Sequence, residues 1–460
     1  MKKICILLLI LCFVFSGCSG NPDFPEESEQ ITSGKVTTGE APRDENKISL
    51  IGSDGNAVYH IIYPENASPL LLEAAGNLRM SLYQLSGKKF DLSGDSAAAQ
   101  DCEILIGSTN RGDSAVNIPL GTYDFIITVK GTKVIITGGS DYATAKALDE
   151  TVSFLEGDQL LLEKDFRYIG NTETEPHLIA LTNQSNGSID VYDITTGVFD
   201  ETTLLHRIKV GANNPAGVKL RRHETWGDVI ITCYGANTGA ILSYPEGKPL
   251  WTTYSAADNP HSVELLPGNI FVVASSSGNA LRFFDLNSNV SVNAYIQVDL
   301  TDAHGVLWDP QNRLLWALSG NELVSYQVGR DASGKITVTE VTGSRIALPT
   351  QYGHDLAPYY GDTNLLWVTT AAQVYLYNKT SKTFTTTIKG IESDKRNDIK
   401  GIGNFHDGSL VLVRPDGVYK DWTTATVDFY IAYHGKYFHY AIKSQTEHFY
   451  KCRVLSADYQ

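Results

Sequence analysis

The chain has 460 residues, of which 42% are hydrophobic and 10% aromatic. This is enough apolar material for two or three folded domains, and it excludes a largely disordered chain. The formal net charge of −15 argues against a nucleic-acid partner, because binding to phosphates needs a basic face, so any cationic site must be local.

The first residues predict an exported lipoprotein. Met1-Lys2-Lys3 precedes an apolar run from Ile4 to Phe15, too short to span a bilayer comfortably, which is the order of regions in a bacterial signal peptide. Phe15-Ser16-Gly17-Cys18 resembles a lipobox, and the resemblance implies a diacylated Cys18 at the start of the mature protein. We therefore expect a signal peptide over residues 1–18 and an anchor at Cys18 that holds the protein at the cell surface or on the outer face of a bacterial membrane. A plain secreted protein and an uncleaved anchor are the alternatives.

Residues 19–46 are rich in Ser, Thr, Gly, Pro and acids, which predicts a disordered tether. Residues 47–171 predict a small α/β domain. Its expected elements are a strand over 58–62, a helix with leucines at helical spacing that ends at Gly87, a strand over 103–107, a hairpin of 125–129 with 133–137, and a helix over 141–155.

Two segments of this domain carry a resemblance to a known family. Ile104-Leu105-Ile106-Gly107-Ser108-Thr109-Asn110-Arg111, followed by Val134-Ile135-Ile136-Thr137-Gly138-Gly139-Ser140, resembles the non-catalytic N-terminal domain of bacterial α-glucuronidases and hexosaminidases. In those enzymes a catalytic barrel follows, and here it does not. The resemblance implies a glycan-processing context, with no active site in this domain.

Beyond a hinge at residues 172–176 the pattern becomes strand-like, and one plan repeats. Asn259-Pro260-His261-Ser262-Val263-Glu264-Leu265-Leu266-Pro267-Gly268-Asn269 predicts a strand and a tight turn, with a histidine at the mouth of the strand. Copies begin at Asn214, Asp302, Tyr352 and Asp398. The spacing of roughly 43 to 50 residues is typical of β-propeller blades. Residues 177–460 thus predict an all-β propeller domain.

Six blades fit the pattern best, with five or seven as alternatives because residues 422–443 are hard to assign. The segment 449–455 is expected to close the ring by pairing with the first blade, which removes the exposed sheet edge. Aromatic residues recur in the third strand of the blades and are expected to pack between neighbouring sheets: Tyr192, Tyr244, Phe284, Tyr326 and Tyr377. Cys102, Cys233 and Cys452 lie in apolar strand patterns and are expected to be buried thiols.

The repeat predicts a functional site at one mouth of the central channel, because the first residues of the innermost strands converge there. The expected mouth residues are Ala216, His261, His304, His354, Lys400 and Lys451. Two residues earlier in each repeat stand further polar or aromatic residues: Asn214, Asn259, Asp302, Tyr352 and Asp398.

Several kinds of chemistry fit this set. His261, His304 and His354 could bind a divalent metal, with Asp302, Asp355 and Asp398 as favourable neighbours, so a metal cofactor is one hypothesis and the cofactor stays unknown. An anionic ligand is better supported, because Lys400, Lys451 and Arg222 supply positive charge and histidines donate hydrogen bonds. A uronate carboxylate fits both this environment and the glycan context of the first domain.

If the site is catalytic, β-elimination on an acidic polysaccharide suits these groups. A cation would neutralise the carboxylate, one of the three histidines would be the base, and Tyr352 would be the acid. The set is similar to that of propeller polysaccharide lyases. Glycoside hydrolysis by Asp302, Asp355 and Asp398 is the rival reaction, although acids at such positions are also common turn residues.

The pattern His-x-Val-x-Leu-Leu-Pro-Gly-Asn also resembles repeats of arylsulfotransferase-like propellers, and the C-terminal region is similar to an uncharacterised family of propeller lipoproteins. An arylsulfotransferase would use a channel histidine as nucleophile, and nothing in the sequence selects one. We therefore predict a monomeric surface lipoprotein of a polysaccharide-utilisation apparatus, which binds or helps process a glycan. A polysaccharide lyase and a structural propeller without a ligand are the alternatives.

Overall fold

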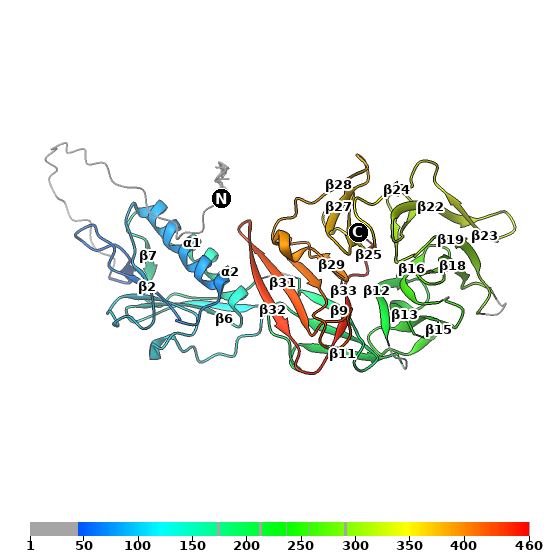
Figure 1. Ribbon diagram of the computed structural model, residues 1–460. Coiled ribbons are helices and arrows are strands. Elements are labelled where there is room, and N and C mark those ends of the chain that lie inside the picture. The colour runs from blue at the N-terminus through cyan, green and yellow to red at the C-terminus, as the bar shows by residue number, and fades with distance from the viewer. Residues whose placement is uncertain are drawn as a thin grey trace. The chain divides into compact units, whose positions relative to one another are not determined.

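The structure is a computed structural model that describes residues 45–172, 175–210, 214–235, 237–256, 258–288 and 292–459 (Figure 1). The predicted signal peptide, Cys18 and all but the last two residues of the predicted tether lie outside this range. The chain divides into two compact units, Met1–Glu173 and Thr174–Gln460. Within the described residues, no helix is both long enough and apolar enough to cross a membrane.

The first unit contains a six-stranded sheet in the order β3-β2-β4-β6-β5-β8. The strands β3, β2, β4 and β6 are parallel to one another, and β5 runs antiparallel to both of its neighbours, β6 and β8. Its strands are β2 (His60–Tyr63), β3 (Leu92–Gly94), β4 (Glu103–Ile106), β5 (Asp124–Lys130), β6 (Lys133–Gly138) and β8 (Arg167–Asn171). A separate pair is formed by β1 (Lys47–Ser49) and β7 (Leu161–Glu163). Short 3-10 turns cover Gly112–Ser114 and Val152–Phe154.

Two helices pack with this sheet, and both were predicted, although the second ends at Thr151 and continues as a 3-10 turn instead of reaching residue 155. Helix α1 (Pro69–Ser86) begins where the Ser68 hydroxyl accepts a hydrogen bond from the Leu71 amide, and it ends at Gly87, whose φ of 68° is left-handed. Helix α2 (Asp141–Thr151) is capped by Ser140 in the same way. The similarity of this unit to the α-glucuronidase domain stays a prediction.

The second unit is a propeller of six sheets arranged in sequence order, counted over the described residues. The blades are, in order, β33-β9-β10-β11, β12 to β15, β16 to β19, β20 to β23 with β24 beside β22, β25 to β28, and β29 to β32. This confirms the predicted number of blades. Residues 426–443, which the sequence pattern left unassigned, form the two outer strands of the last blade.

The strands of the first three blades have the following bounds: β9 (Leu178–Asn183), β10 (Ser188–Asp193), β11 (Leu204–Lys209), β12 (Pro215–His223), β13 (Gly227–Tyr234), β14 (Thr238–Ser243), β15 (Pro249–Thr253), β16 (Pro260–Leu266), β17 (Ile270–Ser275), β18 (Ala280–Asp285) and β19 (Ile296–Asp299).

Those of the last three blades and the closing strand are β20 (Gly305–Asp309), β21 (Leu314–Leu318), β22 (Glu322–Arg330), β23 (Ile336–Glu340), β24 (Ile346–Ala347), β25 (Gly353–Pro358), β26 (Leu365–Thr370), β27 (Val374–Asn378), β28 (Thr383–Thr385), β29 (Gly401–Asn404), β30 (Leu410–Val413), β31 (Thr426–Tyr433), β32 (Lys436–Lys443) and β33 (Phe449–Val454). A 3-10 turn covers Ser393–Lys395.

The ring is closed by strand β33, which pairs antiparallel with β9 and so completes the first blade with the last strand of the chain. This confirms the predicted closure. Neighbouring inner strands approach closely: a Cβ on Gly401 would lie 2.6 Å from the Cys452 amide nitrogen, so only glycine fits there.

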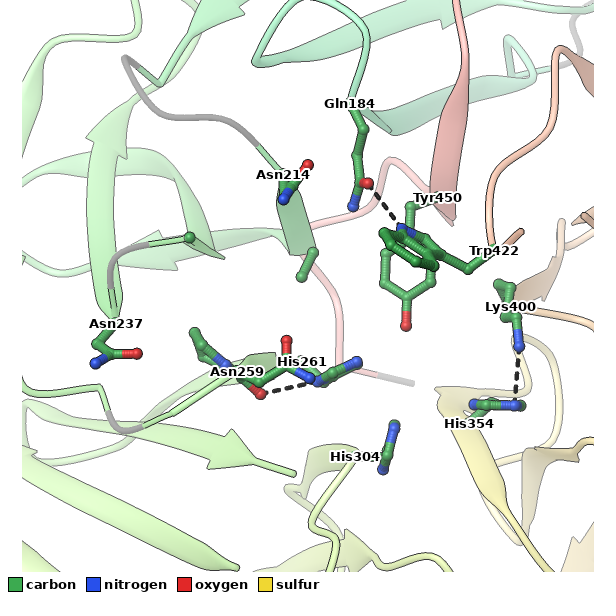
Figure 2. Close-up of a pocket in the computed structure, with 13 residues that line it drawn as sticks. Gln184, Asn214, Asn237, Asn259, His261, His304, His354, Lys400, Trp422 and Tyr450 are labelled. Atoms are coloured by element: carbon green, nitrogen blue, oxygen red, sulfur yellow. Dashed lines mark hydrogen bonds between the residues drawn. The ribbon is translucent and has the colours of Figure 1, made fainter. Parts of the chain in front are cut away.

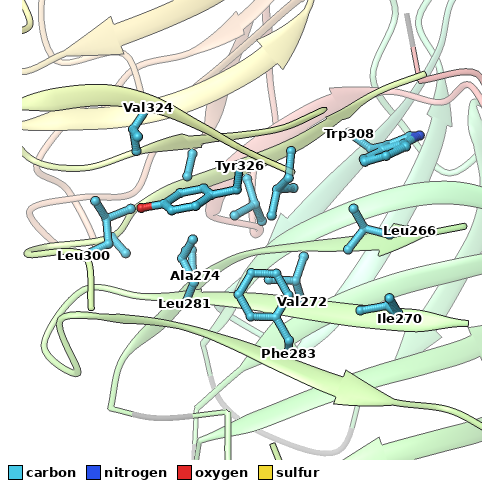
Figure 3. Packing of buried hydrophobic residues seen from close by; sticks show 14 of the residues in the cluster. Leu266, Ile270, Val272, Ala274, Leu281, Phe283, Leu300, Trp308, Val324 and Tyr326 are labelled. Carbon is cyan, nitrogen blue, oxygen red and sulfur yellow. The ribbon is translucent and has the colours of Figure 1, made fainter. Parts of the chain in front are cut away.

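The core lies between the faces of neighbouring blades, as the aromatic column predicts. Tyr192, Phe284, Tyr326 and Tyr377 are all buried, and Tyr244 is half-buried. Figure 3 shows Tyr326 and Phe283 among aliphatic side chains of the third and fourth blades. Cys233 and Cys452 are buried thiols as expected, while Cys102 is only half-buried, and all three are free.

Candidate functional site

The mouth of the channel is built by one backbone device that recurs in the blades. The five residues that the repeat places two positions before the ring all have left-handed backbones, with φ between 53° and 67°: Asn214, Asn259, Asp302, Tyr352 and Asp398. Several inner strands then carry an extra residue, which breaks the pairing register at Ala216, His261 and His354. A bulge of this kind turns one side chain out of the sheet, and here that side chain points into the mouth.

These residues line a pocket of about 470 Å³ (Figure 2). It brings together the predicted Ala216, His261, His304, His354 and Lys400, with Asn214 and Asn259 at its rim. Gln184, Gly235, Asn237, Pro260, Trp422 and Tyr450 complete the lining. Five of the six predicted mouth residues therefore converge on one concave surface.

The backbone fixes the tautomers of two histidines. Nδ1 of His261 lies 2.9 Å from the carbonyl oxygen of Asn259, and Nδ1 of His304 lies 3.0 Å from that of Asp302. A carbonyl oxygen only accepts hydrogen bonds, so each Nδ1 carries a proton, and the Nε2 atom of each ring is the one that the backbone leaves available. The two rings stand side by side, with centroids 4.3 Å apart. The mouth thus holds two adjacent imidazole rings that the backbone orients through their Nδ1 protons.

His354 differs, because Lys400 occupies its Nε2. The Lys400 ammonium donates to His354 Nε2 at 2.9 Å and to Asp398 Oδ1 at 2.6 Å. Burial, and after it the charge of Lys400, lower the pKa of His354 to about 3. Burial and the neighbouring His304 also lower the pKa of His261 well below the ordinary histidine value. Both rings are therefore uncharged at neutral pH.

A second group of polar contacts holds the loop between β30 and β31 over the mouth. The Trp422 indole donates to Gln184 Oε1 at 2.9 Å, and the Lys420 ammonium donates to the Asn214 side-chain oxygen. Lys420 also lies 5.0 Å above the ring of Tyr419. These contacts keep Trp422 at the edge of the pocket, as Figure 2 shows.

Exposed aromatic side chains gather on the loops around this mouth. Tyr254, Tyr352, Tyr419 and Trp422 are 67%, 63%, 48% and 45% exposed, and each lies on a loop at the mouth end of the blades. Tyr295, an exposed aromatic residue of the same unit, lies at the opposite end, before β19. Exposed aromatic surface at the end of the blades that carries a polar pocket makes this end the candidate binding surface, although only Trp422 of the four lines the pocket itself.

The structure corrects the predicted position of Lys451. Strand β33 contains an extra residue between Phe449 and Cys452, and Tyr450 therefore occupies the mouth. Lys451 is 1% exposed, and its ammonium donates to the backbone carbonyl of His354 and to a carboxylate oxygen of Asp355. The predicted register was wrong by one residue because a bulge leaves no mark in the sequence.

Asp355, Arg222 and Tyr352 also lie away from the pocket. Asp355 is fully buried below the mouth; burial would raise its pKa, but Arg453 and Lys451 outweigh burial and lower it. Arg222 lies near the far end of β12, is exposed, and pairs with Asp228. Tyr352 is exposed on the rim loop and does not line the pocket. None of the three is placed to act on a ligand inside the mouth.

Asp302 and Asp398 stay at the rim as hydrogen-bond partners. Asp302 accepts from Nδ1 of His304 at 3.2 Å, and this bond lowers the pKa of Asp302. Asp398 is held by Lys400. Both carboxylates are thus occupied in orienting the ring of mouth residues. Across the described residues, no three His, Cys, Asp or Glu side chains are arranged to hold a metal ion, so the three imidazoles do not form the predicted metal site in this arrangement.

Sequence reasoning missed the residues that come from outer loops. Gln184 and Asn237 follow second strands rather than opening first ones, and Trp422 lies in the segment that could not be assigned. Among these residues, only Tyr450 could have been suspected from the sequence, because it directly precedes Lys451, which was predicted to lie at the mouth.

Comparisons with known proteins add no activity. Residues 214–428, from the second blade into the sixth, match a family of unknown function (DUF6528). None of the curated proteins matches the chain. One similar solved structure is a functionally unknown protein from Desulfotomaculum acetoxidans DSM 771, with 13% identity and a TM-score of 0.38 over 57% of this chain and 78% of that one. Another is the WD40 β-propeller domain of Doa1, with 10% identity and a TM-score of 0.39 over 60% of this chain and 82% of that one. Similarities this distant carry no functional argument.

Proposed function

We propose that the channel mouth of the propeller binds an acidic polysaccharide. The observation that carries this proposal is the set of four exposed aromatic side chains on the loops around a polar pocket: Tyr254, Tyr352, Tyr419 and Trp422. Aromatic rings offer flat apolar faces, which can pack on the C–H faces of sugar rings, while their polar edges stay wet. A polymer can lie across such a rim and send one sugar into the pocket.

The pocket lining suits the groups of a uronate sugar. Lys400 provides a cation at the mouth; burial is the main cause of the low pKa of His354, and the charge of Lys400 lowers it further. Nε2 of His261 and of His304 can accept hydrogen bonds from hydroxyl groups, and Gln184 and Asn237 bring amide groups. The carboxylate would lie nearest Lys400, where a charge-assisted hydrogen bond is strongest.

Binding can be tested with the chain from residue 19 onward and a panel of uronate-containing and neutral polysaccharides. We expect Trp422→Ala to weaken binding of the acidic polymers at least about tenfold, since aromatic anchors are common hot spots. Tyr295→Ala is the control, because Tyr295 is an aromatic residue of similar exposure, 41% against 45%, at the other end of the blades, and the variant should bind normally. Lys400→Met should lose the preference for acidic over neutral polymers.

Absence of binding to every polymer would contradict the proposal and favour a structural propeller without a small ligand. Equal losses in Trp422→Ala and Tyr295→Ala would show that the effect is general rather than local to the mouth.

Cleavage by β-elimination is the second candidate, and the lone pair on His261 Nε2 favours it. A neutral imidazole in a buried site can take the proton next to the uronate carboxylate, and Tyr450, whose ring centroid lies 6.0 Å from that of His261, can protonate the leaving oxygen. The ultraviolet absorbance of an unsaturated uronate product reports this reaction. A signal abolished by His261→Ala, with polymer binding retained, would establish a lyase. Binding without any signal would leave a binding protein.

Display at the cell surface is the last part of the proposal and rests on the sequence alone. The signal-peptide pattern and Cys18 support it, and the resemblance of residues 47–171 to a domain of glycan-processing enzymes supports the same context. Metabolic labelling with a radioactive fatty acid should mark the wild-type protein and leave Cys18→Ser unlabelled. Labelling of the serine variant would contradict lipidation at this residue.

A further inference from the structure

Below the mouth pocket, buried side chains fill the channel of the propeller. The Lys219 ammonium, from the second blade, donates to the Glu264 carboxylate of the third blade at 2.9 Å and to the Val306 carbonyl oxygen of the fourth. Lys219 therefore reaches past one whole blade. Lys219 and Glu264 are at most 4% exposed, so protein rather than solvent occupies this part of the channel.

The other side of the channel is filled in the same way. Lys451, from the first blade, donates to the backbone carbonyl of His354 at 2.9 Å and to the Asp355 carboxylate at 3.2 Å, both in the fifth blade. Its side chain thus passes the sixth blade, which lies between the two in the ring. Arg453, two residues further along β33, donates to the same carboxylate at 2.6 Å. Lys451, Asp355 and Arg453 are all buried.

The mouth pocket is therefore a blind cavity and not the entrance of a tunnel. Another cavity of about 470 Å³ lies at the opposite end of the channel, where Tyr360, Phe405 and Asp407 contribute to its lining. Among the described residues, none lines both cavities. A molecule that enters at the mouth has to leave through the same opening.

The polar groups that could hold a sugar in this cavity lie deep inside it. His304, Lys400 and Tyr450 line the cavity and are 8%, 7% and 5% exposed. The Tyr450 hydroxyl forms no hydrogen bond with any residue that the structure describes, and Figure 2 shows it pointing toward the centre of the pocket. A largely buried hydroxyl without a protein partner is satisfied by water or by a ligand. A sugar has to enter the cavity completely to reach these groups.

We propose that the mouth recognises the end of an acidic polysaccharide chain, a terminal uronate residue, and not the residues within the chain. This inference rests on the proposed function. An internal residue continues into the polymer on two sides, and both continuations would have to leave through the one opening of the cavity. A terminal residue continues on one side only and can enter fully.

The aromatic side chains fit this arrangement. Trp422 lines the pocket at its edge, where it can pack against the sugar that follows the terminal one. Tyr254, Tyr352 and Tyr419 are exposed on the surrounding loops and do not line the pocket, so they are available to the rest of the chain outside it.

The experiment compares long and shortened chains of the same polymer at equal mass. Polygalacturonate, alginate and hyaluronan are each offered to the chain from residue 19 onward, both at full length and after partial acid hydrolysis. Shortening a polymer about tenfold multiplies its ends about tenfold and hardly changes the number of internal residues, so the mass concentration at half-saturation should fall about tenfold.

An unchanged or higher mass concentration at half-saturation would show binding to internal residues. That result would overturn the inference and leave the proposed function standing. Absence of binding at both lengths for all three polymers would contradict the proposed function itself and the inference with it.

A pair of tyrosine variants tests whether the terminal sugar reaches the deep part of the cavity. Tyr450→Phe removes the hydroxyl and keeps the ring, and it should weaken binding of the shortened chains about fivefold or more. Tyr360→Phe is the matched control, because Tyr360 is also 5% exposed but lies at the other end of the channel, and this variant should bind normally. Full affinity of Tyr450→Phe, or an equal loss in Tyr360→Phe, would overturn the inference.

Discussion

Asp355→Asn is the sharpest test of how the propeller is held together. The Asp355 carboxylate on β25 accepts hydrogen bonds from Lys451 and Arg453 on the closing strand and from the Ile402 amide of the next blade. The asparagine keeps the shape of the side chain but leaves two buried cations without their counter-charge. Removing one partner of a buried ion pair costs about 3–5 kcal/mol, and two stranded cations place this variant at the upper end. At roughly 2–4 °C per kcal/mol, the midpoint of thermal unfolding should fall by about 10–20 °C.

Urea and thermal unfolding followed by tryptophan fluorescence would measure this loss. Asp228→Asn is the matched control, because Asp228 pairs with the exposed Arg222 at the surface of the same unit, and its midpoint should stay at the wild-type value. The sequence had placed Asp355 among the ligand-binding acids. A variant with an unchanged midpoint and impaired polysaccharide binding would support that role and refute the structural one.

Three further predictions concern stability and reactivity. Folding lowers the pKa values of His261 and His354, so the unfolded chain binds protons that the folded chain does not. The free energy of unfolding should therefore fall as the pH drops from about 6.5 to 4.5. His354→Gln should flatten this slope in urea titrations. If His261→Ala and His354→Ala both left the pH dependence of stability unchanged, the lowered pKa values of these histidines would be contradicted. Deletion of residues 449–460 should abolish cooperative unfolding of the propeller, measured by calorimetry, because β9 would lose its inner neighbour. A sharp transition at the wild-type midpoint would be incompatible with closure of the ring by β33. Burial raises the pKa of the Cys233 and Cys452 thiols to about 12, so both should react with a thiol reagent only after unfolding, while reaction at the rate of the half-buried Cys102 would show that the blades open.

Much of the propeller could be predicted because its repeat reflects the backbone conformations that the blades require as well as the alternation of apolar residues. The left-handed residue before each inner strand favours Asn or Asp, which occupies four of the five positions, and Tyr352 fills the fifth. Three residues after the left-handed position, Gly217, Gly305 and Gly401 allow neighbouring inner strands to approach closely. These local requirements recur at fixed spacing, so they mark both the blades and the mouth.

The parts that could not be predicted depend on register and on loops. One extra residue in β33 decides whether Tyr450 or Lys451 faces the mouth, and both fit a strand equally well. Trp422 reaches the pocket from a long loop whose course depends on contacts with Gln184, in another blade. The buried ion pair of Lys219 with Glu264 is equally hidden, because both residues alternate in their strands like surface residues and only closure of the ring turns them inward.

The pairing of β33 with β9 also determines at which stage of synthesis the propeller can complete its fold. The bond from the Lys451 amide to the Thr182 hydroxyl spans 269 residues, so the first blade stays incomplete until nearly the whole propeller sequence has emerged from the ribosome or from a membrane pore. Contacts this remote in sequence form slowly, and until then the inner edge of β9 is exposed to pairing with other chains. A propeller chain that emerges one end first can therefore complete its ring only after the C-terminal strand has been released.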